Sequence, residues 1–188
     1  KKTNKIIIFT IVLALFLLGM LLLTGKSGLY EYQLQRLNFL KPCTRYTKVG
    51  TGYQVCNSYI AFNNGGLFGV GIGNSTQKYL YLPESYTDFI FPVIVEELGL
   101  VIGIVILGIY AYIIFRILKI AKKSYNLMSG LMCYGVAADI FIHIFVNLTG
   151  ILGLLPLTGV PLPFLSYGGS FSLSLTIGLT LVQRVNVE

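Results

Sequence analysis

The sequence is poor in charged residues, cysteine and histidine, and each shortage excludes a class of protein. Only 11% of the 188 residues are charged, against roughly 25% in a soluble domain, whereas 55% are hydrophobic. This composition excludes disordered, collagen-like and coiled-coil chains. Three cysteines and one histidine, without CxxC or Cys/His ligand spacing, give neither a disulfide scaffold nor a structural zinc site. The net charge of +7 does not indicate nucleic-acid binding, because the bases lie at the edges of apolar runs.

Four long apolar runs dominate what is present. Each is close to the roughly 20 residues that cross a 30 Å hydrocarbon core. We expect membrane-spanning helices over residues 6–23, 89–118, 127–149 and 167–183. The first run has the basic flank of a signal peptide, but no A-x-A-like cleavage site follows it. The predicted fold class is therefore an all-α polytopic membrane protein that forms a single membrane domain.

The segments between these runs predict the orientation in the membrane. Basic residues are dense in the short segments 1–5 and 116–123, sparse over the long segment 24–88, and absent from the Pro/Gly-rich segment 150–166. The positive-inside rule then places both termini in the cytoplasm, and the loops 24–88 and 150–166 outside. A loop as long as 24–88 is expected to carry function.

Two pairs of residues have readings that the sequence leaves open. Cys43 and Cys56 bracket a turn-rich stretch on the oxidising side, and they form either a disulfide or two unpaired thiols. Asp139 and His143 share one helix face near mid-membrane. They form either a proton relay or a local pair, and we favour the pair because no third relay group is visible. Cys133, within a crossing, is expected to pack as a small hydrophobe.

Glycines and acidic residues near the second apolar run have alternative readings as well. The string GGLFGVGIGNS, residues 65–75, lacks the spacing of a nucleotide-binding loop, so we expect its glycines to permit close approach of backbones or of a lipid-borne ligand. Gly99 and Gly103 form a GxxxG pair that predicts a close-packing helix face. Glu96 and Glu97 either line the outer mouth of the helix bundle or are solvated at the interface.

Three strings occur in a fixed order along the chain: NSTQKYLYLPESYTDFIF at 74–91, EELGL at 96–100 and LLPLTGVPLPFLSYGGS at 154–170. Together they resemble the SEDS family (shape, elongation, division and sporulation), the FtsW/RodA/SpoVE group. The wording QKYLYLPE is closer to the division branch, FtsW, than to the elongation branch, RodA. The resemblance covers nearly the whole chain and implies the C-terminal part of a ten-helix fold. The initial Lys1 suggests a fragment, and we expect no polymerase activity from this piece alone.

The family resemblance implies an enzyme. Family members are peptidoglycan glycosyltransferases that polymerise lipid II, an undecaprenyl-pyrophosphate-linked disaccharide peptide, at the outer face of the bacterial cytoplasmic membrane, in cell division or cell-shape maintenance. Their catalytic aspartate, in a T-D-F motif, maps onto Asp88. There it would act as general base on the acceptor hydroxyl, with one inversion and no covalent intermediate. Positive charge for the leaving pyrophosphate would come from Lys78, from loop bases such as Arg45 or Lys48, or from a divalent cation such as Mg²⁺ or Mn²⁺.

The resemblance also implies a substrate site and partners. The substrate-binding residues assigned from it are Lys78, Glu84, Thr87, Ser166, Gly168 and Gly169. Lys78 and Glu84 have the alternative reading of a local ion pair, and no residue is assigned as a metal ligand. The implied partners are a class B penicillin-binding protein transpeptidase and the division or elongation machinery. Three residues depart from the family pattern, namely Tyr86, Pro92 and Phe171.

Two functions of other classes remain as alternatives. The first is a transporter that flips lipid-linked precursor across the bilayer and depends on Asp139 and His143. The second is a non-catalytic membrane scaffold whose helix faces, marked by Gly99 and Gly103, bind a partner. A change at Asp88 separates the enzyme from both.

Overall fold

The computed structural model describes residues 42–45 and 51–187, all within the compact unit formed by residues 38–188. The elements are the 3-10 helix η1 (Pro42–Arg45) and the helices α3 (Thr51–Gly65), α4 (Thr76–Leu80), α5 (Ile90–Leu98), α6 (Leu100–Lys123), α7 (Leu127–Ile151) and α8 (Gly169–Val187). The described residues contain helices joined by irregular segments and no strand, which confirms the expected all-α class. The crossing expected at 6–23 lies outside these residues.

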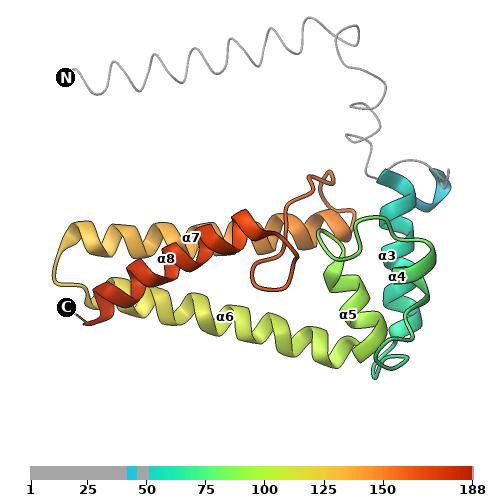
Figure 1. Ribbon diagram of the computed structural model, residues 1–188, viewed down its shortest axis with the longest axis horizontal. Helices are drawn as coiled ribbons and strands as arrows, with labels where there is room; N and C mark the ends of the chain where they lie inside the picture. Colours follow the sequence, from blue (N-terminus) through green and yellow to red (C-terminus); the bar gives the residue numbers. More distant parts are fainter. Residues whose placement is uncertain (1–41, 46–50, 188) are drawn as a thin grey trace, which may run out of the picture. The chain divides into compact units, whose positions relative to one another are not determined.

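Helices α6 and α7 form an antiparallel pair, and α8 packs along both of them (Figure 1). Of the described helices, α6 and α7 are the two that are long and apolar enough to cross a membrane, with 24 and 25 residues. Helix α8 was also expected to cross, but serine, threonine and glycine alternate with its apolar residues and lower its hydropathy. The short turn between α6 and α7 ends where the Asn126 side chain accepts a hydrogen bond from Met128 N, at 3.2 Å, and caps α7.

One helix was expected over residues 89–118, whereas the structure has two, α5 and α6, with a break at Gly99. Gly99 has φ +91°, a backbone conformation that disfavours side chains. A Cβ at this position would lie 2.3 Å from Leu67 O. The amides that start α6 donate instead to the loop after α3, from Leu100 N to Gly66 O at 3.0 Å. The glycine therefore ends one helix and admits another segment of backbone into the gap.

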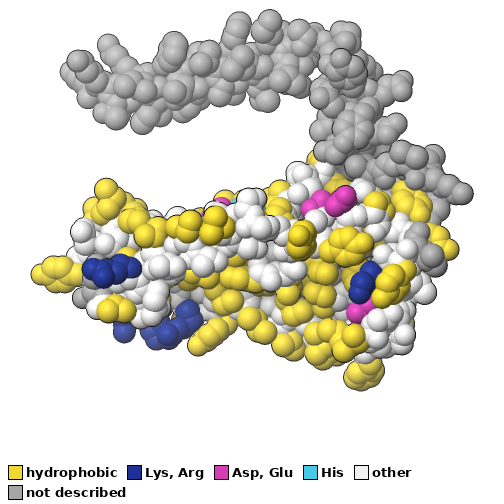
Figure 2. Space-filling view, viewed as in Figure 1, with side chains coloured by type: hydrophobic (Ala, Val, Ile, Leu, Met, Phe, Trp, Pro, Cys, Tyr) yellow, Lys and Arg dark blue, Asp and Glu magenta, His cyan; other side chains and the backbone are white. Residues whose placement is uncertain are grey.

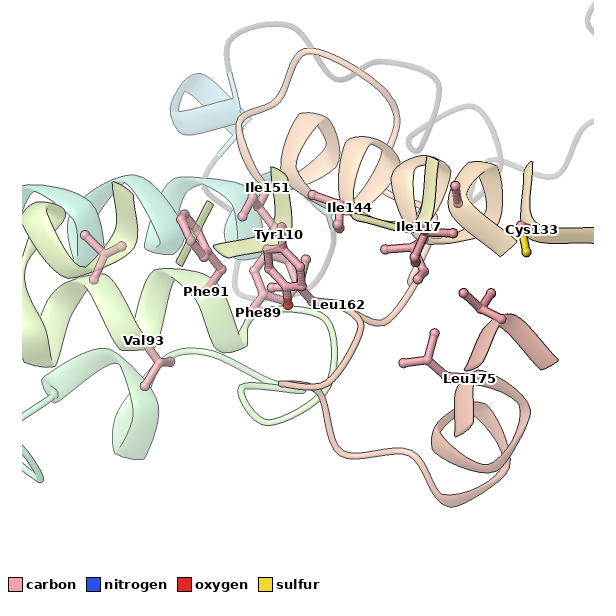
Figure 3. Close-up of a cluster of buried hydrophobic side chains, with 14 of the residues drawn as sticks. Phe89, Phe91, Val93, Tyr110, Ile117, Cys133, Ile144, Ile151, Leu162 and Leu175 are labelled. Atoms are coloured by element: carbon pink, nitrogen blue, oxygen red, sulfur yellow. The ribbon is translucent and has the colours of Figure 1, made fainter. Parts of the chain in front are cut away.

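The hydrophobic core joins α5, α6 and α7 to the loop between α7 and α8, which we call the α7–α8 loop (residues 152–168). Figure 3 shows Phe89, Tyr110, Ile151 and Leu162 close together in this cluster. Phe89, Ile151 and Leu162 are fully buried, although Phe89 and Leu162 lie outside helices. Core packing thus fixes two irregular segments against the helices, and these segments build the site described below. Cys133 is also fully buried in the core, as expected.

The part of segment 24–88 that the structure describes contains helices, although it was expected as a loop. Helix α3 begins at Thr51, within the stretch that was read as turn-rich, and packs against α5. Cys43 in η1 and Cys56 in α3 form a disulfide, which answers the question that the sequence left open. The glycines of 65–75 do permit close backbone approach, since a Cβ on Gly65 would lie 2.1 Å from Val95 O.

Candidate functional site

Asp88 lies at the end of the α4–α5 connection, two residues before α5 begins. A turn shapes this segment around Glu84, whose φ is +58°. Glu84 O accepts hydrogen bonds from Thr87 N, at 3.2 Å, and from Phe89 N, at 3.4 Å. The Thr87 hydroxyl donates to Glu84 Oε2 at 3.1 Å. With Phe89 buried in the core, the Asp88 side chain leaves the segment beside the α7–α8 loop.

Three successive backbone carbonyls at Asp88 are each held by a different donor. Asn147 Nδ2 donates to Asp88 O at 2.9 Å, and Ser166 Oγ donates to Thr87 O at 2.5 Å. Tyr167 N donates to Tyr86 O at 2.9 Å. We call these three donors the Asp88 clamp (Asn147, Ser166 and Tyr167). They come from α7 and from the α7–α8 loop, so segments about 60 to 80 residues apart jointly orient the aspartate.

The α7–α8 loop is itself fixed by protein donors. Asn147 Nδ2 makes a second bond, to Val160 O at 2.7 Å, and Leu162 N donates to Ser166 Oγ at 2.7 Å. Tyr110 OH, from the middle of α6, donates to Pro163 O. Irregular backbone at membrane depth requires such internal partners, because lipid offers none. The expected irregular outer segment is present, and its tip reaches the level of Tyr110.

The carboxyl of Asp88 is partly buried next to a glycine. A Cβ on Gly159, whose φ is +74°, would lie 3.2 Å from Asp88 Oδ2, so only glycine leaves that side of the carboxylate free. Burial raises the pKa of the Asp88 carboxyl above its usual range, and the negative charge of Glu84 raises it further. A raised pKa improves a carboxylate as a proton acceptor while it remains ionised near neutral pH. The arrangement suits a general base.

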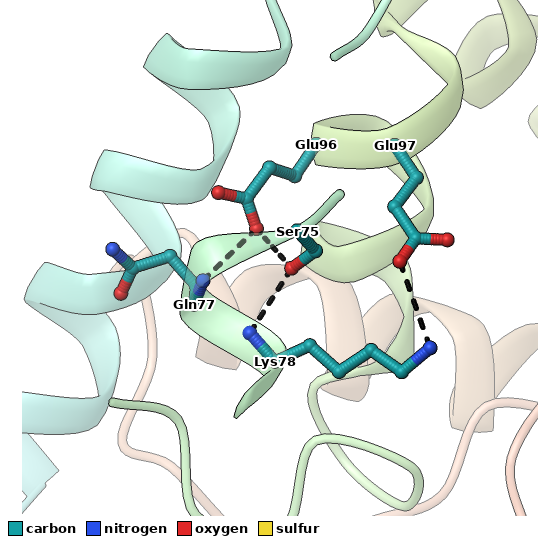
Figure 4. Close-up of polar contacts among 5 residues, drawn as sticks. All are labelled: Ser75, Gln77, Lys78, Glu96 and Glu97. Carbon is teal, nitrogen blue, oxygen red and sulfur yellow. Dashed lines mark hydrogen bonds and ion pairs between the residues drawn. The ribbon is translucent and has the colours of Figure 1, made fainter. Parts of the chain in front are cut away.

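Lys78, expected to contact substrate, is engaged elsewhere. Its ammonium pairs with Glu97 Oε1 at 3.6 Å (Figure 4). It also lies 5.3 Å from the centre of the Tyr79 ring. Glu97 follows Asp88 by nine residues, most of them in α5, a rise of about 13 Å along a helix. Lys78 therefore belongs to the far end of α5 from Asp88. The ion pair that the sequence left open exists, but its partner is Glu97 and not Glu84.

Glu96 is fully buried, so neither expectation for it holds. Its carboxylate accepts hydrogen bonds from four donors. They are Ser75 Oγ, Gln77 N at 3.3 Å, and Asn64 Nδ2 and Thr76 Oγ1, each at 3.1 Å (Figure 4). Ser75 also caps α4 by accepting from Lys78 N at 3.0 Å. Glu96 thus ties α3 and the start of α4 to the end of α5.

The remaining residues assigned from the sequence divide into two groups. Thr87 and Ser166 meet directly at the site. Gly168 follows the clamp residue Tyr167, and Gly169 begins α8, where a Cβ would meet nothing within 4 Å. Neither glycine contacts the carboxylate through a hydrogen bond that the described residues show.

The Asp139–His143 pair is local. His143 Nδ1 lies 2.9 Å from Asp139 O and 3.5 Å from Asp139 Oδ1. The Phe171 ring, one of the departures from the family pattern, packs on the imidazole with ring centroids 4.7 Å apart. The other departures are accommodated too, since the Tyr86 side chain is exposed and Pro92 lies in the first turn of α5, where a missing amide is tolerated. The contacts fit the structural reading of the pair.

Metal binding has little support from the described side chains. Among the described residues, no group of three or more His, Cys, Asp or Glu could hold a metal ion. Mg²⁺ needs only one or two protein carboxylates when phosphate oxygens complete its coordination. Glu84 and Asp88 offer that number, so the divalent cation stays a prediction.

Asn147 is the site residue that sequence reasoning missed. Its side chain is buried, donates to two carbonyls, and leaves its own Oδ1 without a hydrogen-bond partner. The available signal was an amide in the otherwise apolar end of a spanning helix, IFVNLTG, where a polar group must face protein. The strings that carry the family resemblance, at 74–91, 96–100 and 154–170, do not include Asn147.

The fold and the site define a helical membrane protein with a carboxylate site at one end of its helices. The profile of the FtsW/RodA/SpoVE family, described as cell cycle protein, matches residues 2–188, and the chain belongs to this family. The resemblance stated from the sequence is thereby confirmed.

Curated relatives point to the division branch. The chain is 42% identical over 184 residues to the probable peptidoglycan glycosyltransferase FtsW of Coxiella burnetii, covering 96% of this chain and 48% of the relative. It is 45% identical over 150 residues to the protein of the same name from Bacillus subtilis, covering 80% and 37%. Stage V sporulation protein E of Bacillus subtilis is 40% identical over 169 residues, covering 88% and 45%. The chain spans about half or less of the length of these relatives.

A solved structure has the same fold. It is described as "Structural coordination of polymerization and crosslinking by a peptidoglycan synthase complex". The similarity has a TM-score of 0.64 with 29% sequence identity, and covers 93% of this chain and 48% of the other. The likeness extends the family assignment to the arrangement of the helices.

Proposed function

We propose that the full-length protein containing this chain is a peptidoglycan glycosyltransferase that polymerises lipid II, with Asp88 as its general base. The observation that carries the proposal is the Asp88 clamp, which fixes the aspartate backbone at three successive carbonyls. Such fixation matters because a catalytic group must be held in a productive geometry for the reaction to gain from proximity. The names of the relatives supply the reaction class.

The proposed reaction uses a single displacement. The 4-hydroxyl of the acceptor sugar attacks the anomeric carbon of the donor, and the bond from that carbon to the pyrophosphate oxygen breaks. Asp88 accepts the hydroxyl proton as the new bond forms, and undecaprenyl pyrophosphate leaves with the electron pair. An α-linked donor thus gives a β-linked product by one inversion. General-base assistance of this kind typically contributes 10²–10⁴-fold.

Charge for the leaving pyrophosphate comes from outside the immediate surroundings of Asp88. Lys78 is paired with Glu97, at the other end of α5. Lys48 and the side chain of Arg45 lie outside the described residues. We therefore propose such loop bases for this role, or a divalent cation, which Glu84 and Asp88 would hold and which would neutralise charge on the pyrophosphate. Chelation of divalent cations by EDTA is expected to slow polymerisation. If the rate is unchanged, the loop bases alone supply the positive charge for the pyrophosphate.

The proposed setting is the cytoplasmic membrane, with Asp88 on the outer side. The basic residues from Arg116 to Lys123 end α6 at the opposite end from α5, and by the positive-inside rule they support a cytoplasmic position for that end. The partner that we propose is a class B penicillin-binding protein. The solved structure of similar fold supports this, because its description couples polymerisation with crosslinking. FtsW-like relatives favour a role in division.

The test is polymerisation of labelled lipid II by the full-length protein and its transpeptidase partner in liposomes. We expect Asp88→Asn to abolish glycan chains while the protein folds and binds its partner normally. The matched control is Asp139→Asn, which removes a carboxylate of α7 that does not contact the site and should keep activity. Polymer from Asp88→Asn would reject the base assignment. Loss of precursor translocation in Asp139→Asn, with polymer never formed by the unsubstituted protein, would favour the transporter instead.

A further inference from the structure

The loop between α3 and α4 carries large apolar side chains that face away from the protein. We call residues 66–73, with the sequence GLFGVGIG, the apolar loop. Phe68 is 85% exposed, Ile72 81%, Leu67 60% and Val70 41%. Neither the site nor the proposed reaction uses these residues. No charged residue occurs from Gly65 to Gln77.

The backbone of this loop is fixed, so its side chains do not fold back onto the chain. Val70 N and Gly71 N donate to Glu96 O and Glu97 O, each at 2.9 Å. Leu100 N and Val101 N donate in return to Gly66 O and Leu67 O. A Cβ on Gly69, with φ +79°, would lie 2.3 Å from Glu97 O. The glycines therefore bring the loop backbone against the α5–α6 junction, and the apolar residues between them remain on the outside.

The loop continues an exposed apolar surface of the membrane-spanning helix α6. Leu100 and Val101, whose amides donate to the loop at the start of α6, are 43% and 45% exposed. Ile104, one turn further along α6, is 59% exposed. Figure 2 shows hydrophobic side chains along this flank and at the end near α3 and α5, whereas most of the visible Lys and Arg side chains gather at the other end of the α6–α7 pair. The surface is thus continuous from the span to the apolar loop.

The uncharged part of α6 is shorter than the hydrocarbon core, although the whole helix of 24 residues is long enough to cross it. The uncharged stretch before Arg116, Leu100–Phe115, has 16 residues and rises about 24 Å. The hydrocarbon core is about 30 Å thick, and any tilt shortens the span further. The apolar loop lies at the uncharged end of α6, where it adds apolar surface to this stretch.

We propose that the apolar loop inserts into the outer leaflet and contacts lipid acyl chains, extending the hydrophobic surface of α6. Lipid suits the surface better than water does, because a contiguous apolar patch on a fixed loop marks a membrane or protein contact. The loop then anchors the end of α5 opposite Asp88, close to the Glu96 and Glu97 contacts. This inference rests on membrane insertion of α6 and does not depend on the proposed reaction.

The test uses a tryptophan as a depth reporter, since this chain has none. The full-length protein carrying Phe68→Trp is reconstituted in phosphatidylethanolamine and phosphatidylglycerol vesicles, with or without lipids brominated on their acyl chains. The emission of the unsubstituted protein is subtracted. The matched control is Tyr79→Trp, an exposed aromatic position on α4 beside Lys78. Ile72→Trp is a second reporter in case the first variant fails to fold.

We expect brominated acyl chains to reduce the emission at position 68 at least two-fold, with little quenching by aqueous iodide. At position 79 we expect strong quenching by aqueous iodide and little quenching by brominated acyl chains. Quenching at position 68 by iodide and not by brominated lipid would overturn the proposal, because the loop would then face water. Emission at position 68 that responds to neither quencher would also overturn it, because a protein segment or partner would then cover the loop.

Discussion

Replacement of Asn147 tests whether the Asp88 clamp positions the carboxylate that we propose as the general base. Asn147→Ala removes the donor to Asp88 O and to Val160 O, which lie 2.9 and 2.7 Å from Nδ2. A buried carbonyl left without a partner costs about 1–3 kcal/mol, so the two together cost about 2–6 kcal/mol. If about 2 kcal/mol, the lower figure, is lost entirely from the stability of the correctly oriented site, the polymerisation rate falls about 30-fold.

A second substitution separates positioning from packing. Asn147→Asp keeps the size and shape of the side chain but sets a carboxylate against two carbonyl oxygens, next to Asp88. We therefore expect Asp to be more damaging than Ala at this position, because it adds repulsion to the lost bonds. If the side chain only filled space, the near-isosteric Asp would be the milder change.

The assay is the initial rate of lipid II polymerisation by the full-length protein, together with its thermal midpoint and its binding to the transpeptidase. Thr149→Val is the matched control on α7, since the Thr149 hydroxyl bonds only to backbone of its own helix, to Phe145 O at 2.6 Å and Val146 O at 3.2 Å. The reasoning is refuted if Asn147→Ala polymerises at the unsubstituted rate, or if the Asp variant is the more active of the two.

Three further substitutions address the surroundings of the site. Glu84→Gln should shift the acid limb of the pH–rate profile to lower pH, because loss of the negative charge of Glu84 lowers the raised pKa of Asp88. Asp88 must be ionised to act as a base. An acid limb that does not move would show that Glu84 does not raise the pKa of Asp88. Gly159→Ala should reduce the polymerisation rate about ten-fold or more, because the φ of +74° is strained for alanine and its Cβ would lie 3.2 Å from Asp88 Oδ2. Gly135→Ala, on an open face of α7, is the control and should leave the rate unchanged. Glu96→Gln should lower the free energy of unfolding by about 2–3 kcal/mol, because an amide replaces a charged acceptor of four hydrogen bonds; an unchanged thermal midpoint would contradict this.

A long hydrophobic run indicated the bounds of α7 closely. The run expected to span 127–149 forms α7, Leu127–Ile151. This run is long, it begins directly after the capping residue Asn126, and a turn that contains glycine follows it. The same reasoning could not separate α5 from α6. A glycine within an apolar run is compatible both with a continuous helix and with a break, and the backbone that fills the gap at Gly99 comes from residues more than 30 positions earlier.

The sequence indicated candidate residues for the site but not how the site is constructed. Asp88 and Ser166 were found because a family motif marks them, and the structure does place Ser166 on the Asp88 segment. The partners of Lys78 and Glu96 could not be predicted, because a charged side chain in a sequence does not reveal its partner, and the substrate-binding role of Lys78 stays a prediction. Glu96 looked like a residue of the cavity mouth, yet its donors belong to α3 and to the start of α4. Long-range hydrogen bonds of this kind leave no periodic signal in the chain.

The Asp88 clamp also determines where a proton taken up by Asp88 can go. On the membrane side of the aspartate, both hydrogen atoms of the Asn147 amide are directed at carbonyl oxygens, and the Ser166 hydroxyl donates to another. An amide nitrogen has no ionisable proton to exchange at neutral pH, so Asn147 separates Asp88 from His143, one turn deeper on α7. In the proposed reaction, the proton released at each addition of a sugar unit would therefore leave toward the outer aqueous phase, and glycan synthesis would proceed without moving charge across the membrane.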